Sequence, residues 1–461
     1  MRQPWFASDV WLADGWARNV RCEVDAQGSI VRIDADANAD GCERIDGPVL
    51  PGLCDLHSHA FQRAMAGLAE SSSADHQADS FWTWRDLMYR FVAALTPEAI
   101  GSIAAQLYVE LLKGGYTSVC EFHYLHRDAK GERYANPGEI SERIIAAARE
   151  AGLGLTLLPV LYMASGFGGV PPHPEQRRFV GDPDELLGLV QSLRRWHGDT
   201  VRVGVAPHSL RAVPPQAFDV LVEGLGAIGG GPIHIHVAEQ AKEVDDCLAW
   251  SGQRPVQWLL DRQPVSPAWC LVHATHMKAG ETLALARTGA TVGLCPTTEA
   301  NLGDGFFALP EYVGQGGVYG IGSDSNISTS CAEELRWLEY GQRLKLRQRN
   351  VVRPAGDRKG QHSGGETLYR QALHGGAQAS GRPVNGLMAG QRADLVVLDA
   401  NHSSLIGRDR ASWLDAYVFC ALGNPVRHVM VGGQWVIRDR RHALEEGIAT
   451  RYAGALRELT S

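Results

Sequence analysis

The chain has 461 residues, of which 44% are hydrophobic and 21% charged, and these proportions exclude disordered, collagen-like and coiled-coil proteins. Lys and Arg number 44 against 52 Asp and Glu, which gives a net charge of −8, and no block of basic residues stands out. This balance argues against a protein that binds nucleic acid or an anionic membrane. We therefore expect a small molecule as the partner, with no nucleic acid and no membrane.

The cysteines and the N-terminus bear on the compartment. The nine cysteines are scattered singly, without a CxxC pair, a pattern typical of reduced thiols in the cytoplasm. Asp9 and Asp14 interrupt the N-terminal segment where a signal peptide needs an unbroken apolar stretch. No segment approaches the ~18 consecutive apolar residues of a membrane span. We therefore expect a soluble, cytoplasmic protein.

The two ends of the chain share one pattern. Residues 1–52 alternate apolar and polar side chains between Gly and Asp turns, and two stretches after Gln391 do the same. Both patterns predict short antiparallel strands. Because neither end is long enough to bury a good core alone, we expect residues 1–52 and 382–461 to pair into one small β-sandwich domain.

Short apolar runs that end in polar residues fill the middle of the chain. Eight of them begin at Leu53, Tyr116, Leu153, Val201, Ile233, Cys270, Thr291 and Val318. Amphipathic patterns predict helices over 98–112, 139–151, 183–196, 215–225, 241–260, 278–287 and 332–346. The polar, Gly-rich stretch 347–367 predicts a loop. This alternation predicts an α/β fold, a (β/α)8 TIM barrel over residues 53–381, with an open doubly wound sheet as the alternative.

A pair of histidines ends the first run. His57 and His59 are two residues apart, so both imidazoles lie on the same face of a strand and can bind one cation. An HxH pattern alone is a weak signal for a metal. Two unrelated histidines are the alternative in a chain that contains 17 of them.

The residues at the ends of three other runs favour a metal site over two unrelated histidines. His236 and Glu239 follow the fifth run, His273 ends the sixth, and Asp324 ends the eighth. In a TIM barrel these strand ends meet at the C-terminal rim, where the chemistry lies. Imidazole and carboxylate ligands suit Zn²⁺ or Fe²⁺ in a catalytic site. We therefore expect a metal-dependent enzyme.

Four motifs resemble a known family. VLPGLCDLHSHA, HIHVAEQ, LVHATH and GIGSDS are similar to the amidohydrolase superfamily, in its branch of deaminases with a single metal ion, and the resemblance extends over essentially the whole chain. The resemblance implies four metal ligands, which are His57, His59, His236 and Asp324. It also implies three catalytic residues, which are Glu239, His273 and Asp324. Branches with two metals carry a carboxylated Lys on the fourth strand, and VRVGVAPH has none. We expect one divalent ion, Zn²⁺, with Fe²⁺ as the alternative.

Within that branch, three segments resemble the deiminases that hydrolyse N-formimino-L-glutamate to N-formyl-L-glutamate and ammonia in histidine degradation. They are HSHAFQRAMAG, SFWTWRDLMYR and APHSLRAVP. A substrate with two carboxylates favours bidentate arginines, and Arg85 and Arg211 lie within loop reach of the strand ends. A surface ion pair is the alternative for each. The resemblance also implies substrate contacts by Gln62, Tyr124 and His208, and a homodimer.

Two other functions stay open. A deaminase or chlorohydrolase of the same branch, acting on a nucleobase, an adenosine derivative or a triazine, would share every metal ligand, and mainly Arg85, Arg211 and Tyr124 separate it from the first hypothesis. A barrel that has lost catalysis and serves as a scaffold is the other alternative. All expected ligands and acid–base groups are present, which favours an enzyme.

Overall fold

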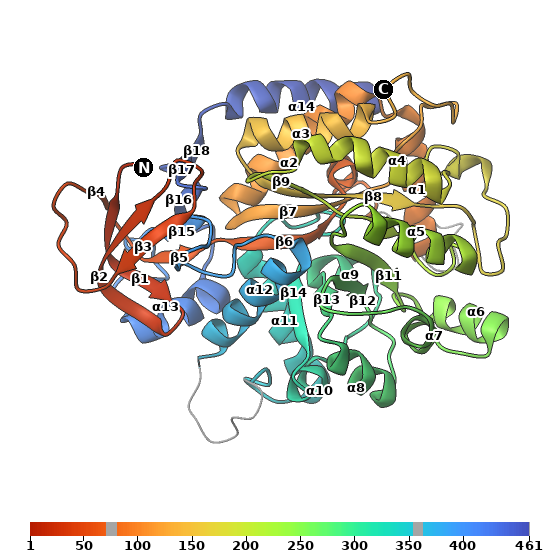
Figure 1. The fold of residues 1–461 in the computed structure, drawn as a ribbon. Coiled ribbons are helices and arrows are strands. Elements are labelled where there is room, and N and C mark those ends of the chain that lie inside the picture. The colour runs from red at the N-terminus through yellow and green to blue at the C-terminus, as the bar shows by residue number, and fades with distance from the viewer. Residues whose placement is uncertain (71–80, 354–362, 461) are drawn as a thin grey trace.

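The computed structural model describes residues 1–70, 81–353 and 363–460. Figure 1 shows two parts, a β-sheet that contains the N-terminus and a larger barrel surrounded by helices. The predicted loop 347–367 falls partly on residues 354–362, which lie outside the described residues.

The eight apolar runs form the strands of the barrel, in two parallel sheets. The first sheet contains β6 (Leu53–Ser58), β7 (Tyr116–His123), β8 (Gly154–Leu161), β9 (Val201–Val203) and β10 (Ala206–Pro207). The second contains β11 (Ile233–Val237), β12 (Trp269–His273), β13 (Thr291–Leu294) and β14 (Val318–Ile321). Parallel bridges join Ser58 to Asp324 and Val205 to Ile233, so the sheets meet along both edges. The predicted TIM barrel is confirmed.

Most predicted helices are present with similar bounds. They are α2 (Pro97–Lys113), α3 (Glu139–Ala151), α4 (Pro183–Leu193) with η3 (Arg194–Trp196), α5 (Pro215–Ala227), α8 (Ala279–Thr288) and α11 (Cys331–Leu346). The single helix predicted over 241–260 is wrong. Gly252, at φ 72°, ends α6 (Ala241–Ser251), and Pro255 begins α7 (Pro255–Arg262), because a left-handed Gly ends a helix and Pro suits the first turn of the next.

Several helices lie outside the predicted set. They are η1 (Ala60–Met65), α1 (Phe81–Ala94), η2 (Pro174–Gln176), α9 (Pro296–Leu302), α10 (Leu309–Gly314), α12 (Gly364–Ser380), α13 (Arg410–Asp415), η4 (Ala416–Cys420) and α14 (Glu445–Thr460). The predicted loop is wrong at its end, because Ser363 accepts a hydrogen bond from the Glu366 backbone and caps α12. Gly375 of α12 lies so close to β14 that a Cβ atom would be 1.9 Å from the Tyr319 carbonyl oxygen.

Both chain ends contribute to one nine-stranded sheet. Its strands are β1 (Trp5–Leu12), β2 (Gly15–Val24), β3 (Ile30–Asp34), β4 (Glu43–Ile45), β5 (Val49–Pro51), β15 (Leu395–Leu398), β16 (Val426–Val431), β17 (Gln434–Arg438) and β18 (Arg441–His442). Antiparallel pairing of β5 with β15 joins the two ends. Residues of β1, β2, β15 and β16 share one buried apolar cluster. The predicted pairing of the chain ends is confirmed.

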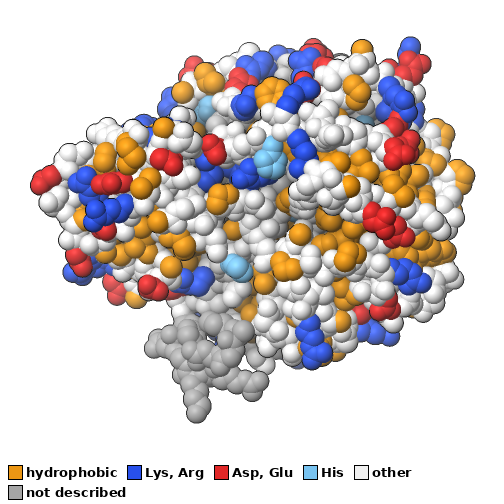
Figure 2. Space-filling view, in the orientation of Figure 1, with side chains coloured by type: hydrophobic (Ala, Val, Ile, Leu, Met, Phe, Trp, Pro, Cys, Tyr) orange, Lys and Arg blue, Asp and Glu red, His pale blue; other side chains and the backbone are white. Residues whose placement is uncertain are grey.

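The boundaries 1–52 plus 382–461 and 53–381 stay a prediction. Helix α14 lies beside α2 on the outside of the barrel (Figure 1), with Ile448 and Ala455 buried and Arg451 paired with Glu150 of α3 at 2.7 Å. The C-terminal segment thus extends beyond the sheet. None of the helices in the described ranges is long and apolar enough to span a membrane. On the face shown in Figure 2, Lys and Arg side chains are interspersed with Asp and Glu.

Candidate active site

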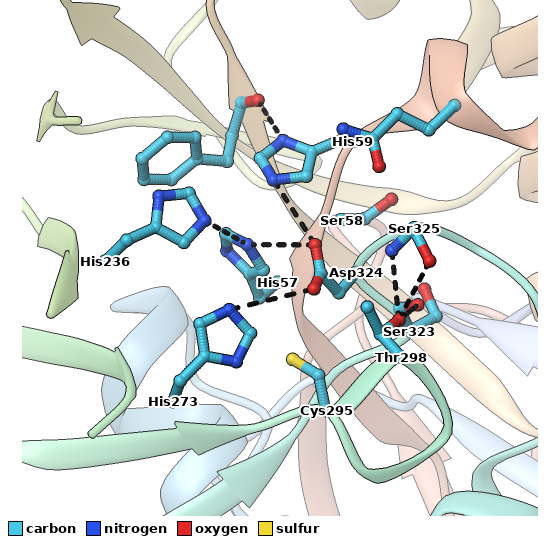
Figure 3. Close-up of polar contacts among 12 residues, drawn as sticks. His57, Ser58, His59, His236, His273, Cys295, Thr298, Ser323, Asp324 and Ser325 are labelled. Atoms are coloured by element: carbon cyan, nitrogen blue, oxygen red, sulfur yellow. Dashed lines mark hydrogen bonds and ion pairs between the residues drawn. The ribbon is translucent and has the colours of Figure 1, made fainter. Parts of the chain in front are cut away.

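The four predicted ligands converge at the C-terminal end of the barrel (Figure 3). The donor atoms of His57, His59, His236 and Asp324 lie within 4.8 Å of one another, and all four residues are buried. The Nε2 atoms of His57 and His59 lie 3.5 and 3.3 Å from Asp324 Oδ1, and His57 Nε2 lies 3.0 Å from His236 Nε2. Three strand ends thus supply one compact N/O donor set.

The bridge that closes the barrel also positions Asp324. The Asp324 backbone donates to the His57 carbonyl at 2.9 Å, and the His59 backbone donates to the Asp324 carbonyl at 3.0 Å. Asn326 Nδ2 donates to the carbonyls of His59 and Asp324 at 3.1 and 3.0 Å. The carboxylate is therefore held between the two histidines by backbone contacts as well as by its own ion pairs.

Non-glycine residues with positive φ occur at three of these strand ends. Ala238, after β11, has φ 51°, His273 at the end of β12 has φ 66°, and Asp324 after β14 has φ 47°. Such positions cost about 1–3 kcal/mol each and are typical of functional sites. The Glu243 carboxylate accepts the backbone N–H groups of Ala238 and Glu239 at 3.0 and 3.1 Å, which holds the first of these turns.

The hydrogen bonds of the rings show that the donor set fits a cation. Nδ1 of His59 lies 3.0 Å from the Phe122 carbonyl, and Nδ1 of His236 lies 3.1 Å from the His208 carbonyl. A carbonyl only accepts, so each Nδ1 carries the hydrogen and, in the neutral ring, each Nε2 has a lone pair. These lone pairs meet Asp324 and His57 Nε2 at one point, an arrangement that favours a divalent metal ion with oriented imidazole ligands.

The ionisation states agree with this fit. Burial lowers the pKa of His57 to about 3, and burial also lowers the pKa values of His59 and His236. Burial alone would raise the pKa of Asp324, but the hydrogen bond and charge of His57 hold it well below its usual range. Neutral imidazoles and an ionised carboxylate are the forms that bind a metal. Cys295 also lies near Asp324 (Figure 3), but burial raises the pKa of its thiol well above the usual value, which makes it a poor ligand.

Two acid–base candidates lie beside the donor set. His273 Nε2 is 3.7 Å from Asp324 Oδ2 and 3.9 Å from Glu239 Oε1, and its Nδ1 is 3.2 Å from Glu299 Oε1. Burial would lower the pKa of His273, but these carboxylates raise it to about 10. Burial raises the pKa of Glu239. The pair therefore places a protonated ring and a carboxyl group with a high proton affinity at one edge of the site.

The predicted site residues surround one pocket, apart from His57, which is fully buried next to it. The pocket is lined by His59, Gln62, Arg85, Tyr124, His208, Arg211, His236, Glu239, His273 and Asp324. The structure thus brings together every residue that the sequence singled out. The role of each residue stays a prediction at this point.

The predicted substrate contacts have distinct surroundings. Gln62 Nε2 donates to the Tyr124 hydroxyl at 2.9 Å, and the buried Gln62 Oε1 finds no partner among the residues that the structure describes. The His208 ring contacts the His236 ring at a centroid distance of 5.0 Å. Burial would lower the pKa of Arg211, but Tyr162 and nearby carboxylates raise it. The pocket therefore contains a permanently charged guanidinium, that of Arg211, and a hydrogen-bond acceptor that is available to a ligand, Gln62 Oε1.

Arg85 reaches the pocket from helix α1. Its guanidinium carbon lies 5.5 Å from the centre of the Tyr89 ring, and both residues line the pocket. The other end of α1 is held by Arg178, which is 1% exposed and donates to the carbonyls of Val92 and Leu95, the latter at 2.8 Å. The barrel loop after β8 therefore holds the helix that carries Arg85.

Sequence reasoning missed three residues of this site. They are Tyr162, Gln176 and Glu299, whereas Tyr89 was expected in a lid or wall of the pocket and lines it. Glu299 had a usable signal, because Pro296 and Glu299 after the seventh apolar run are typical of a helix start at the rim. Tyr162 and Gln176 had none, since they lie in the segment after β8, whose path depends on the tertiary structure.

Comparison with known proteins identifies the family. Residues 49–436 match the model of the Amidohydrolase family. The chain belongs to this family. Residues 5–47 of this amidohydrolase match the model described as "Formimidoylglutamate deiminase HutF, N-terminal domain".

Individual relatives of the amidohydrolase were found among curated proteins and solved structures. It is 54% identical to the formimidoylglutamate deiminase of Pseudomonas aeruginosa over 98% of this chain and 99% of the relative. It is 27% identical to the 5-methylthioadenosine/S-adenosylhomocysteine deaminase of Natronomonas pharaonis over 96% and 93%. A crystal structure of an amidohydrolase from Brucella melitensis has a TM-score of 0.92, with 45% identity and full coverage of both chains.

Proposed function

We propose that this amidohydrolase hydrolyses N-formimino-L-glutamate to N-formyl-L-glutamate and ammonia, in histidine degradation. The observation that carries the proposal is that Arg85 and Arg211 line the same pocket as the metal donor set. A dianionic substrate favours such cations, whereas a neutral heterocycle does not require them. The relative that shares 54% identity is a formimidoylglutamate deiminase, which supports the same substrate.

We propose that His57, His59, His236 and Asp324 hold one divalent ion. The convergent lone pairs and the ionised carboxylate described above support this set. A divalent ion in this position would act as a Lewis acid that activates water at neutral pH. Zn²⁺ is our choice and Fe²⁺ the alternative, because both accept imidazole and carboxylate ligands.

The protein groups then divide the proton transfers between them. Asp324 Oδ2, which faces His273, would accept the proton of the attacking water. Glu239 would deliver a proton to the nitrogen that leaves as ammonia, since its raised pKa keeps a proton available. His273, charged through its three carboxylate neighbours, would orient the water and stabilise negative charge at the reacting carbon.

The remaining pocket residues would bind the substrate. Gln62 Oε1 has no partner among the described residues and would accept from the formimino nitrogen, next to the Tyr124 hydroxyl. Arg85 and Arg211 would bind the carboxylates, and His208 lies between the metal donors and this end of the pocket. These contacts would place the formimino carbon at the donor set.

Arg211→Met is expected to raise KM for N-formimino-L-glutamate by about 10²-fold, because a hydrogen-bonded charge pair with a carboxylate is lost. Steady-state kinetics over a wide substrate range measure this change. Arg143→Met on α3, where the side chain forms surface ion pairs with Glu98 and Glu139, is the control and should leave KM unchanged. An unaltered KM in Arg211→Met would remove this residue from substrate binding.

A substrate panel tests the proposed function as a whole. The purified, metal-loaded protein is assayed for ammonia release from N-formimino-L-glutamate, guanine and 5′-methylthioadenosine, and for chloride release from a chlorotriazine. We expect turnover of the formimino compound, with kcat/KM above roughly 10⁴ M⁻¹s⁻¹, and none of the heterocycles. Turnover of a heterocycle without turnover of the formimino compound would return the chain to the other deaminases of its branch.

We propose in addition that the enzyme acts in the cytoplasm as a homodimer. All nine cysteines are free thiols in the structure, which supports a reducing compartment. The dimer is implied by the family resemblance alone. Light scattering on the purified protein would test the dimer, with a mass of one chain as the contrary result.

A further inference from the structure

A buried glutamine lies beside the pocket. Gln176, the last residue of η2, is 0% exposed. Its Nε2 atom lies 3.0 Å from the Tyr89 hydroxyl and 2.8 Å from the Tyr162 hydroxyl. Tyr89 belongs to α1, Tyr162 directly follows β8, and both line the pocket. One amide therefore connects a helix and a barrel strand at the pocket wall.

The direction of these hydrogen bonds follows from the other end of the amide. Gln176 Oε1 lies 2.8 Å from the backbone nitrogen of His173, and a backbone N–H can only donate. The oxygen is thereby assigned, so the amino group faces the two hydroxyls and has one hydrogen for each. Tyr89 and Tyr162 both accept, and each keeps its own hydroxyl hydrogen for another acceptor.

These hydrogens are available to a ligand in the pocket, because both tyrosines line it. Burial and the neighbouring Tyr89 raise the pKa of Tyr162 above its usual value, so the phenol is neutral and has a hydrogen to donate. Without a substrate, one of these hydrogens can be shared between the two hydroxyls. A substrate carboxylate has two oxygen atoms and can accept both hydrogens.

The tyrosine pair lies at the cationic end of the pocket, away from the metal donors. The charges of Arg211 and Arg85 both act on Tyr162. The His208 ring contacts His236 at 5.0 Å and Tyr162 at 4.8 Å between centroids, so it separates this end from the metal donor set. A substrate that reacts at the metal would present its distant end here.

We propose that Tyr89 and Tyr162 donate hydrogen bonds to the side-chain carboxylate of the substrate, and that Gln176 is the positioning residue that makes both hydroxyls donors. The inference rests on the proposed function and deepens it. The arginines supply charge at this end of the pocket, and the hydroxyls select an acceptor at the correct distance from the formimino carbon. Selection of chain length would then depend on the tyrosines as well as on the arginines.

Tyr89→Phe and Tyr162→Phe test the first part. With N-formimino-L-glutamate we expect each change to raise KM about 10-fold, and kcat to stay within about 3-fold, because the lost contact is remote from the reacting carbon. The same variants are assayed with N-formimino-L-norvaline, which has a methyl group in place of the side-chain carboxylate. Here KM should be the same for variants and wild type.

Gln176→Glu tests the positioning role. A carboxylate at this position accepts from both hydroxyls and withdraws their hydrogens from the pocket, so KM for N-formimino-L-glutamate should rise at least as much as in Tyr89→Phe or Tyr162→Phe. Gln176→Met leaves the hydroxyls free to donate and should have a much smaller effect. Thermal unfolding of each variant shows whether the fold is kept.

Tyr312→Phe is the matched control, because Tyr312 is a buried tyrosine that hydrogen-bonds to backbone carbonyls outside the pocket. It should leave KM unchanged for both compounds. The inference is overturned if the Tyr89 and Tyr162 variants lose activity equally with both compounds, or if Gln176→Glu and Gln176→Met behave alike. Failure of the wild-type protein to hydrolyse N-formimino-L-glutamate would instead refute the proposed function.

Discussion

Glu239→Gln is expected to lower kcat by about 10²–10⁴-fold, the usual contribution of a general acid or base, while the protein keeps its metal ion. The amide has nearly the same shape as the carboxyl group but cannot donate or accept the transferred proton. The backbone N–H of Glu239 remains bonded to Glu243, and the side chain is not in the metal donor set. The change should therefore remove the proton transfer alone.

Glu223→Gln on α5 is the control for this change, because Glu223 is exposed and lies outside the pocket. Metal content by mass spectrometry and kcat by ammonia release are measured for both variants. Unchanged kcat in Glu239→Gln would remove Glu239 from the mechanism. Loss of the metal in this variant would give it a structural role instead.

Removal of the metal is expected to lower turnover by more than about 10³-fold, because no protein group in the pocket can activate water as a Lewis acid does. It should also lower Tm, since a ligand bound only to the folded state stabilises that state. In the metal-free protein the Asp324 carboxylate and the lone pairs of His59 and His236 remain buried without their cation.

Dialysis against dipicolinate, followed by metal analysis, activity and thermal unfolding, measures these effects. Addition of Zn²⁺ or Fe²⁺ to separate samples should restore both activity and Tm, and the extent of recovery shows which ion serves better. Asp324→Asn should fail to recover with either ion. A metal-free preparation that keeps full turnover would contradict the proposed metal site.

Strand geometry predicted which side chains meet at one rim of the barrel, and the family resemblance separated the proposed metal ligands from the other residues there. His57 and His59 are two residues apart on β6, and parallel strands of a closed barrel end at the same rim whatever the lengths of the intervening loops. His236 and Asp324 could therefore be assigned to the same site from their positions at the ends of β11 and β14. The period of a strand and the topology of the barrel predicted this convergence, but the choice of His236 over His234, which shares its face of the strand, depended on the HxxE spacing of the family.

The contacts within the wall of the pocket were not predictable in the same way. Gln176 ends η2 in the segment after β8, and its partner Tyr89 comes from α1, which is held by Arg178. These contacts depend on how long segments pack outside the barrel, and no local period encodes that packing.

The break between α6 and α7 could have been predicted from the sequence. Gly252 and Pro255 are ordinary signals for the end and the start of a helix, but the prediction followed the apolar pattern over 241–260 instead.

Identification of the products tests the central claim most directly. Wild-type, metal-loaded protein is incubated with N-formimino-L-glutamate, and ammonia, N-formyl-L-glutamate, formamide and L-glutamate are quantified in the same sample. We expect ammonia and N-formyl-L-glutamate in equal amounts, because Glu239 would protonate the terminal nitrogen. Formamide and L-glutamate would show that the other C–N bond breaks and would contradict the proposed reaction.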